Sequence, residues 1–306
     1  MEDYNKIIES LGVRFINAKN TKILEPFTIR NFYDVENMIL ILNKGQIKFG
    51  KEDEVVNQGE ILFIPGGKQV SLTYGTGEPA KLSNDEFVNN EEKYFQSFHD
   101  DPSTINEENF SYVNFEAKVF DSVNFFSSLD IPPFVIKDNP TIAGLIKSIV
   151  SETRAVLPGK DRVIKISVDH LVVEIIRYII KNRLFVEQLA TNSTYFKDPR
   201  LIDIFAYIRE NLEGDLSNKV LAGVANVSED YVGQYFKMLT GINPQDYIEY
   251  QRMEKAVNLL RTSKKSIRDI GRDVGYKDTA YFCRRFKMMF GIPAGKMRRR
   301  ESLMNI

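Results

Sequence analysis

Residues 231–242 read YVGQYFKMLTGI, and residues 281–292 read YFCRRFKMMFGI. The two stretches align without a gap at an offset of 50 residues and are identical at six of twelve positions. Agreement of this kind indicates a duplicated supersecondary unit. The last third of the chain is therefore expected to hold the same structural motif twice.

Each copy carries the signals for two short helices joined by a tight turn. These signals are N-caps at Ser217, Ser228, Ser266 and Asp278, turn residues at Asn226 and Gly275, and helix-ending glycines at Gly241 and Gly291. Such a pair of helices is a helix-turn-helix unit, predicted here twice. Between the units, Pro244 fits the first position of a longer helix that runs to about Thr262. That helix would span ~28 Å, close to the roughly 34 Å between consecutive major-groove faces.

Residues 199–300 resemble the DNA-binding domain of the AraC/XylS family of bacterial transcription regulators. The matching residues are Leu221, Ala222, Ser228, Phe236, Lys237, Gly241, Pro244, Tyr247, Arg252, Ala256, Leu259, Leu260, Ile267, Ile270, Gly271, Val274, Gly275, Tyr276, Tyr281, Phe282, Phe286, Lys287, Gly291, Pro293 and Arg298. The chain departs from the family pattern at Gly271, where alanine is usual, and at Asn226, where glycine is common. The resemblance implies an all-α domain that binds double-stranded promoter DNA, with RNA polymerase as a further partner.

The resemblance also places the DNA contacts on the exposed faces of the two repeated helices. The predicted DNA-binding residues are Ser228, Glu229, Asp230, Gln234, Lys237, Thr279, Ala280, Arg284 and Lys287. Arg284 can bind guanine with a bidentate fork, and Gln234 can bind adenine in the same way. Lys237 and Lys287 are expected to contact phosphates of the DNA backbone. Sequence-independent affinity is expected from Lys264, Lys265, Arg268, Arg272 and the basic residues 298–300.

The front half shows the pattern of strands. Between residues 26 and 74, short apolar runs alternate with turn signals, which predicts a small antiparallel barrel or sandwich with a hairpin at Gly45. The stretch GQIKFGKEDEVVNQGEILFIPGGKQVSL (45–72) resembles a cupin barrel, which is also a common N-terminal domain in the AraC/XylS family. Gln69 stands where a metal-binding cupin usually has a histidine, and the chain holds only His99 and His170. We therefore expect no metal, no cofactor and no catalytic residues.

A long helix predicted over residues 161–183 is apolar on two faces. One face is expected to cover the barrel and the other to pair with a second subunit, with Val173, Ile176 and Ile180 as homodimer contacts. Packing of both faces within one chain is the alternative. Residues 75–110 are polar and acidic and are expected to form an irregular insert or to be partly disordered. The predicted α+β organisation is a cupin-like sensor and dimerisation domain (1–183), a linker (184–198) and a double helix-turn-helix domain (199–306).

Charge is distributed unevenly along the chain. Residues 1–198 hold 22 basic and 29 acidic side chains, whereas residues 199–306 hold 19 and 13. Cys283 is the single cysteine, and no apolar run is long enough to span a membrane, so we expect a cytoplasmic protein without membrane contact. The predicted function is sequence-specific transcription regulation, with an N-terminal domain that senses an unknown small-molecule effector, dimerises, or does both. The alternatives are a cupin-type enzyme with an accessory DNA-binding module, and a regulator controlled by a protein partner.

Overall fold

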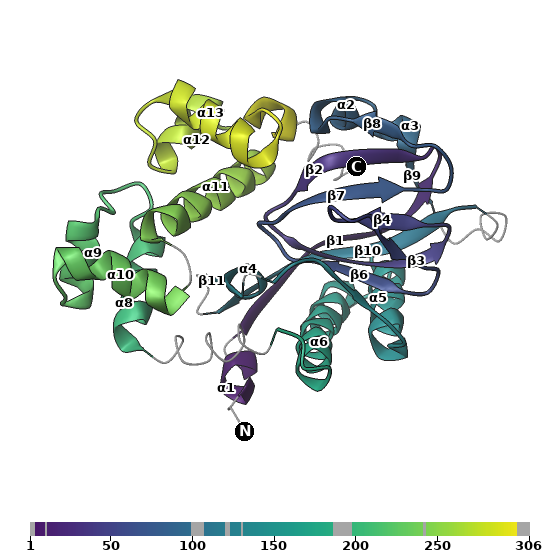
Figure 1. Cartoon of the computed structure of the whole chain (residues 1–306), viewed down its shortest axis with the longest axis horizontal. Helices are drawn as coiled ribbons and strands as arrows, with labels where there is room; N and C mark the ends of the chain where they lie inside the picture. Colours follow the sequence, from purple (N-terminus) through teal and green to yellow (C-terminus); the bar gives the residue numbers. More distant parts are fainter. Residues whose placement is uncertain are drawn as a thin grey trace.

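The computed structural model describes residues 4–9, 11–98, 107–119, 123–129, 131–185, 198–240 and 243–298. Figure 1 shows a part built around β-sheets, coloured purple to teal, beside a helical part coloured green to yellow. The fold class is as predicted, because an antiparallel sheet domain comes first and a helical domain follows.

Two sheets form the N-terminal domain. The seven-stranded sheet has the order β12-β6-β3-β10-β1-β9, with β11 paired to β10, and the five-stranded sheet has the order β5-β4-β7-β2-β8. The strands are β1 (Leu11–Ile23), β2 (Phe27–Tyr33), β3 (Asn37–Lys44), β4 (Ile47–Phe49), β5 (Glu54–Val56), β6 (Ile61–Ile64), β7 (Gln69–Tyr74), β8 (Ala80–Leu82), β9 (Phe95–Ser97), β10 (Asn109–Val119), β11 (Val123–Asn124) and β12 (Phe134–Ile136). Neighbouring strands run antiparallel except for β2 and β8, which pair in parallel.

The larger sheet is buried on both faces, which explains its continuous apolar runs. In β3, Ile39 and Ile41 belong to the core under helices α5 (Pro140–Glu152) and α6 (Lys160–Lys181). Leu40 and Leu42 belong to the core between the two sheets. The alternation of side chains along one strand thus supplies both cores.

The hairpin expected at Gly45 is wrong. β3 pairs with β6 and β10 in the larger sheet, whereas β4 pairs with β5 and β7 in the smaller one. Gly45 has φ +100° and carries the chain from one sheet to the other, and a Cβ atom there would lie 2.8 Å from the Glu108 side chain. A glycine is needed at this crossing because any side chain would be strained and crowded.

The acidic region 75–110 is more regular than expected. It contains β8, α2 (Asn84–Asn89), α3 (Glu91–Tyr94) and β9, although residues 99–106, with His99, lie outside the described residues. Phe87, Tyr94 and Phe95 pack around Phe27 with ring centroids 4.8–5.3 Å apart. Aromatic contacts therefore hold this segment over one end of the barrel.

The remaining helices frame the two domains. α1 (Tyr4–Glu9) and α4 (Phe125–Ser128) are short, and the C-terminal helices are α8 (Pro199–Glu210), α9 (Asn218–Ala225), α10 (Glu229–Thr240), α11 (Pro244–Thr262), α12 (Ile267–Asp273) and α13 (Thr279–Phe290). Pro244 lies in the first turn of α11, as predicted. Of the expected linker 184–198, residues 186–197 lie outside the described part of the chain, so the domain boundaries stay predictions.

Candidate nucleic-acid interface and barrel cavity

The two predicted helix-turn-helix units are present as α9–α10 and α12–α13. Asn226 ends α9 in the left-handed conformation, with φ 53°, and Gly275 follows α12 with φ +88°. Asp278 caps α13, because its Oδ1 accepts a hydrogen bond from the Tyr281 amide at 2.6 Å. Ser266 caps α12 by accepting from the Asp269 amide at 3.1 Å. Ser217 stands at the N-cap of α9 but makes no capping hydrogen bond with its side chain. Side-chain caps predicted from the sequence therefore hold the start of α12 and α13.

The predicted DNA-binding residues line the outer faces of α10 and α13. Those that are exposed are Ser228, Glu229, Asp230, Gln234, Lys237, Ala280, Arg284 and Lys287, while Thr279 is half-buried. Phe236 and Phe286, which occupy the same position in the repeat, are fully buried. The repeat thus places equivalent side chains on equivalent surfaces.

Sequence reasoning missed four exposed residues on these faces. Tyr231 and Tyr281 are 44% and 48% exposed, and Met238 and Met288 are each 60% exposed. All four are identical between the repeats, and apolar groups this exposed at matching positions indicate a shared contact surface. Their identity in the two copies of the repeat is the sequence signal that points to them.

Arg284 and its neighbour Arg285 have different environments. The Arg284 guanidinium lies 6.0 Å from the centre of the Tyr281 ring and stays exposed. Arg285 instead makes a two-pronged ion pair with Glu249 of α11, in which its Nε donates to Oε1 at 2.5 Å. The ion pair fixes Arg285 against α11, so Arg284 alone of the two faces outward.

Several expected phosphate-binding cations are engaged within the chain. Lys265 pairs with Asp273 at 2.5 Å, and Arg272 pairs with Asp269 at 3.2 Å. Lys264 and Arg268 are exposed, and Arg298 donates to the Lys265 carbonyl oxygen. Residues 299 and 300 lie outside the described residues.

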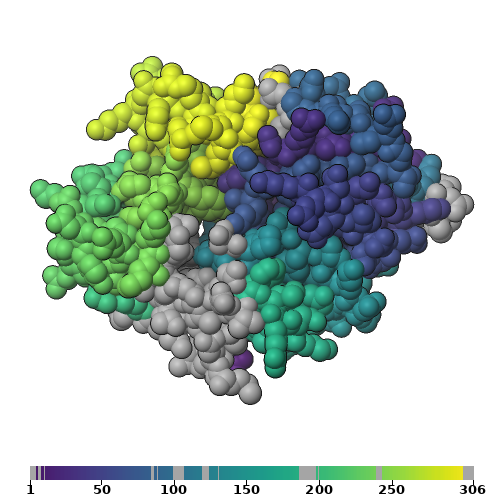
Figure 2. Space-filling view, in the orientation of Figure 1, coloured from purple at the N-terminus to yellow at the C-terminus, as the bar shows by residue number. Residues whose placement is uncertain are grey.

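The barrel contacts the helical domain through the segment between β2 and β3. Figure 2 shows the yellow C-terminal helices against the purple and blue strands. Tyr33 and Val35 are buried in the core of α11–α13, and the Tyr33 ring lies 5.1 Å from that of Phe290. Glu36 binds both terminal nitrogens of the Arg261 guanidinium, with one of these bonds at 3.0 Å. This segment therefore connects the two domains by packing and by a buried ion pair.

A second ionic chain crosses the same junction. Arg14 binds Glu116 with two hydrogen bonds of 2.7 and 2.9 Å, and Lys118 lies 3.5 Å from Glu116 and 2.5 Å from Glu254 of α11. Burial raises the pKa of Glu254, and the charge of Lys118 only partly offsets this. Burial opposes ionisation of Glu116 as well, but the Arg14 hydrogen bond and the Lys118 charge hold the pKa of Glu116 below its ordinary value.

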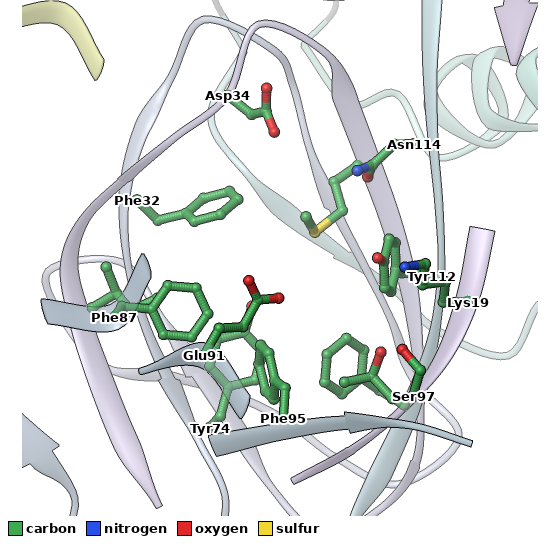
Figure 3. A pocket seen from close by; sticks show the side chains of 14 residues that line it. Lys19, Phe32, Asp34, Tyr74, Phe87, Glu91, Phe95, Ser97, Tyr112 and Asn114 are labelled. Atoms are coloured by element: carbon green, nitrogen blue, oxygen red, sulfur yellow. The ribbon is translucent and has the colours of Figure 1, made fainter. Parts of the chain in front are cut away.

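A cavity opens between the two sheets on the barrel side of this junction (Figure 3). The cavity has a volume of about 100 Å³. Its lining consists of Lys19, Thr21, Ile29, Phe32, Asp34, Met38, Tyr74, Phe87, Glu91, Phe95, Ser97, Phe110, Tyr112 and Asn114. The lining combines aromatic rings with a few charged and polar groups, as small-molecule sites do.

Comparisons with known proteins give matches to the helical C-terminal third of the chain. A helix-turn-helix domain profile matches residues 221–300. The chain is 33% identical over 97 residues to the MmsAB operon regulatory protein of Pseudomonas aeruginosa, an alignment that spans 32% of each protein. It is also 30% identical over 114 residues to the Tn10 TetD protein of Escherichia coli, and this alignment covers 83% of that relative and 37% of this chain.

The chain belongs to the AraC/XylS family of transcription regulators. A solved structure of ToxT from Vibrio cholerae aligns over 96% of this chain and 99% of its own, with a TM-score of 0.54 and 12% identity. That likeness shows a shared two-domain fold.

The structure accommodates both departures from the AraC/XylS pattern. Gly271 is buried where the family usually has alanine, and the Phe282 ring lies 3.2 Å from the place that a Cβ atom would take. The ring thus leaves little room for the methyl group of an alanine. Asn226 adopts the left-handed turn conformation that glycine supplies elsewhere in the family, and asparagine tolerates this conformation.

Two further features bear on the alternatives raised by the cupin resemblance. Among the described residues, no three histidine, cysteine, aspartate or glutamate side chains are grouped as a metal site requires. Gln69 lies at the start of β7 with its side chain exposed.

In the described ranges, no helix is long and apolar enough to cross a membrane.

Proposed function

We propose that this protein is a sequence-specific regulator of transcription that reads two consecutive major-groove faces of promoter DNA with α10 and α13. The observation that carries the proposal is the repetition of outward-facing residues on the two helices, with the matching phenylalanines buried beneath them. The 19-residue α11 joins the units and is ~28 Å long, close to the roughly 34 Å groove repeat. RNA polymerase is the protein on which such a regulator would act at a promoter.

Base recognition is assigned to the exposed polar residues of each reading helix. Arg284 is the guanine reader, because its guanidinium is exposed and its neighbour Arg285 is held by Glu249. Gln234 suits adenine, and Asp230 can accept a hydrogen bond from cytosine. Lys237 and Lys287, at matching positions, are assigned to phosphates.

The test compares two variants of the full-length protein on one duplex selected from a random pool and on unselected DNA. Arg284→Ala should weaken binding to the selected duplex by roughly 1–3 kcal/mol and leave unselected DNA almost unaffected. Lys287→Ala should weaken both about equally and reduce the slope of log affinity against log salt by about 1. If Arg284→Ala weakened binding to both DNAs equally, Arg284 would not read a base. If the affinity did not depend on salt, electrostatic attraction would not contribute to binding.

We infer that the barrel is the sensing domain. The aromatic cavity supports this, as does the segment Phe32–Glu36, in which Phe32 and Asp34 line the cavity while Tyr33 and Val35 pack against the helical domain. Neighbouring residues of one extended segment thus contact the cavity and the helices. A molecule in the cavity would act on the DNA-binding domain over a short distance.

We also propose a homodimer formed through the outer face of α6. Of the predicted contacts, Ile176 is 1% exposed and packs within its own chain, while Val173 and Ile180 are half-buried. Val163 and Ile166 are 43% and 55% exposed on the same helix, and Leu157 just before it is 65% exposed. Such an apolar stripe favours an isologous contact between two copies.

A further inference from the structure

We propose that the barrel cavity binds a small organic cation, with a primary ammonium or similar N–H-bearing group attached to an apolar or aromatic body. The inference rests on the proposed sensing function and specifies its ligand. It is carried by the charge of the lining, by an acceptor atom in its wall and by the rings around it.

The charged lining favours a positive ligand. Asp34 and Glu91 supply two carboxylates, and Lys19 supplies the single cation of the lining. Figure 3 shows the Asp34 and Glu91 side chains directed into the cavity. Lys19 lies opposite Tyr112 across the β1–β10 ladder. Asp34 Oδ1 accepts a hydrogen bond from the Val35 amide at 2.8 Å, and Arg261 lies 3.8 Å from Asp34. Because Arg261 is shared with Glu36, carboxylates still outnumber cations around the cavity.

Asn114 adds an acceptor that needs a donor. This residue is 7% exposed and lines the cavity, and its Oδ1 atom has no hydrogen-bond partner within the protein. A buried carbonyl oxygen left without a donor is energetically unfavourable, because it has given up its hydrogen bonds to water. A ligand with N–H groups would satisfy Asn114 Oδ1, whereas a carboxylate ligand would place a further acceptor beside it.

The aromatic wall favours the same ligand. Six ring-bearing residues surround the cavity, namely Phe32, Tyr74, Phe87, Phe95, Phe110 and Tyr112. The faces of such rings carry negative charge and attract cations, and their area covers an apolar body. Burial raises the pKa of the Tyr74 phenol above its ordinary value, so this ring stays neutral. An anion would meet two carboxylates and one lysine among aromatic rings.

Three probes of similar shape separate the classes of ligand. Binding of 2-phenylethylammonium, 3-phenylpropanol and 3-phenylpropionate to the full-length protein is measured by calorimetry at pH 7. The cation should bind at least ten times more tightly than the alcohol, and the carboxylate should bind least. If the carboxylate bound more tightly than the cation, the proposal would be overturned. The same conclusion would follow if carboxylate binding were lost in Lys19→Met, because both results indicate an anionic ligand.

Two variants of one helix locate the site. Glu91→Gln should weaken cation binding at least tenfold, because Glu91 lines the cavity. Glu92→Gln removes the same charge from the next residue, which is exposed and outside the lining, and should leave the affinity within twofold. Asn114→Leu should also weaken binding of the cation. Equal effects of the two glutamate variants would mean that the cation binds elsewhere.

The same samples are tested for binding to duplex DNA. If the protein binds DNA but none of the three probes, the cation proposal fails while the regulator proposal stands. If the protein binds the cation but not the DNA, the regulator proposal fails while the cation proposal stands.

Discussion

Gly275 forms the turn of the second helix-turn-helix at a position that has no space for a side chain. Its φ is +88°, and a Cβ atom would lie 2.5 Å from the Leu212 carbonyl oxygen and 2.8 Å from Arg252 Nε. Arg252 Nε itself donates to the Leu212 carbonyl at 2.8 Å. The turn therefore passes directly over a hydrogen bond that ties α11 to the loop after α8, and it leaves no room for a side chain.

Replacing this glycine tests both effects at once. Gly275→Ala should cost more than about 3 kcal/mol of unfolding free energy, because backbone strain adds to a clash with immobile atoms. Gly59→Ala is the matched control, since Gly59 has φ +84° with nothing within 4 Å of its Cβ position. The control should lose only the strain, about 1–2 kcal/mol. Similar losses in urea unfolding would mean that the turn relaxes around the new methyl group.

At the scale of single residues, the sequence predicted the helical domain well because its signals are local. Asp278 and Ser266 cap the helices that follow them, and Pro244 begins α11. The exposed residues Tyr281 and Met288 were missed because aromatic and thioether side chains are more often buried than outward-facing. The cavity lining was also beyond prediction, since it draws on six strands and two helices that are spread from β1 to β10.

At the scale of elements, strand pairing was the weakest prediction. β3 and β4 are separated by a short turn, which normally indicates a hairpin, yet each pairs with strands of a different sheet. The partners of β3 are β6 and β10, and this pairing is set by packing of the whole barrel rather than by the turn. In α6, the sequence showed two apolar faces, but it could not show that Ile176 faces inward.

The dimer proposal rests on the exposed apolar residues of α6, Val163 and Ile166, and on Leu157 just before the helix. Ile166→Glu places a charge in the middle of the stripe and should convert a dimer into a monomer at tens of micromolar, as measured by sedimentation of the full chain. Thr141→Glu adds the same charge at an exposed position in the first turn of α5 and should leave the assembly unchanged. A wild-type chain that sediments as a monomer would contradict the proposal outright.

At the scale of the whole molecule, the junction between the domains is rich in buried charge. Glu254 of α11 is 6% exposed and depends on Lys118 of β10 for compensation. Because burial raises its pKa above the ordinary 4.5, the folded protein holds this proton more tightly than the unfolded chain. The contribution of Glu254 to stability is therefore greatest at low pH and declines as pH rises through its folded pKa.

This dependence can be isolated with one variant. Glu254→Gln removes the titrating group but keeps an oxygen that can accept from Lys118. The unfolding free energy of the variant minus that of the wild type should increase as pH rises from about 4.5 upward, and then level off. Glu52→Gln, at an exposed carboxylate outside the junction, should show no such trend. A difference that stays constant with pH would mean that Glu254 titrates normally.

The alternating segment Phe32–Glu36 has a consequence for dose and response. If a molecule beside Asp34 changes how tightly Arg261 and the helices are held, then thermodynamic reciprocity requires operator DNA to change the affinity of that molecule by the same factor. The concentration of effector needed for half-saturation would then differ between free protein and protein on its promoter. A cell holding many operator copies would accordingly respond at another effector threshold than a cell holding one.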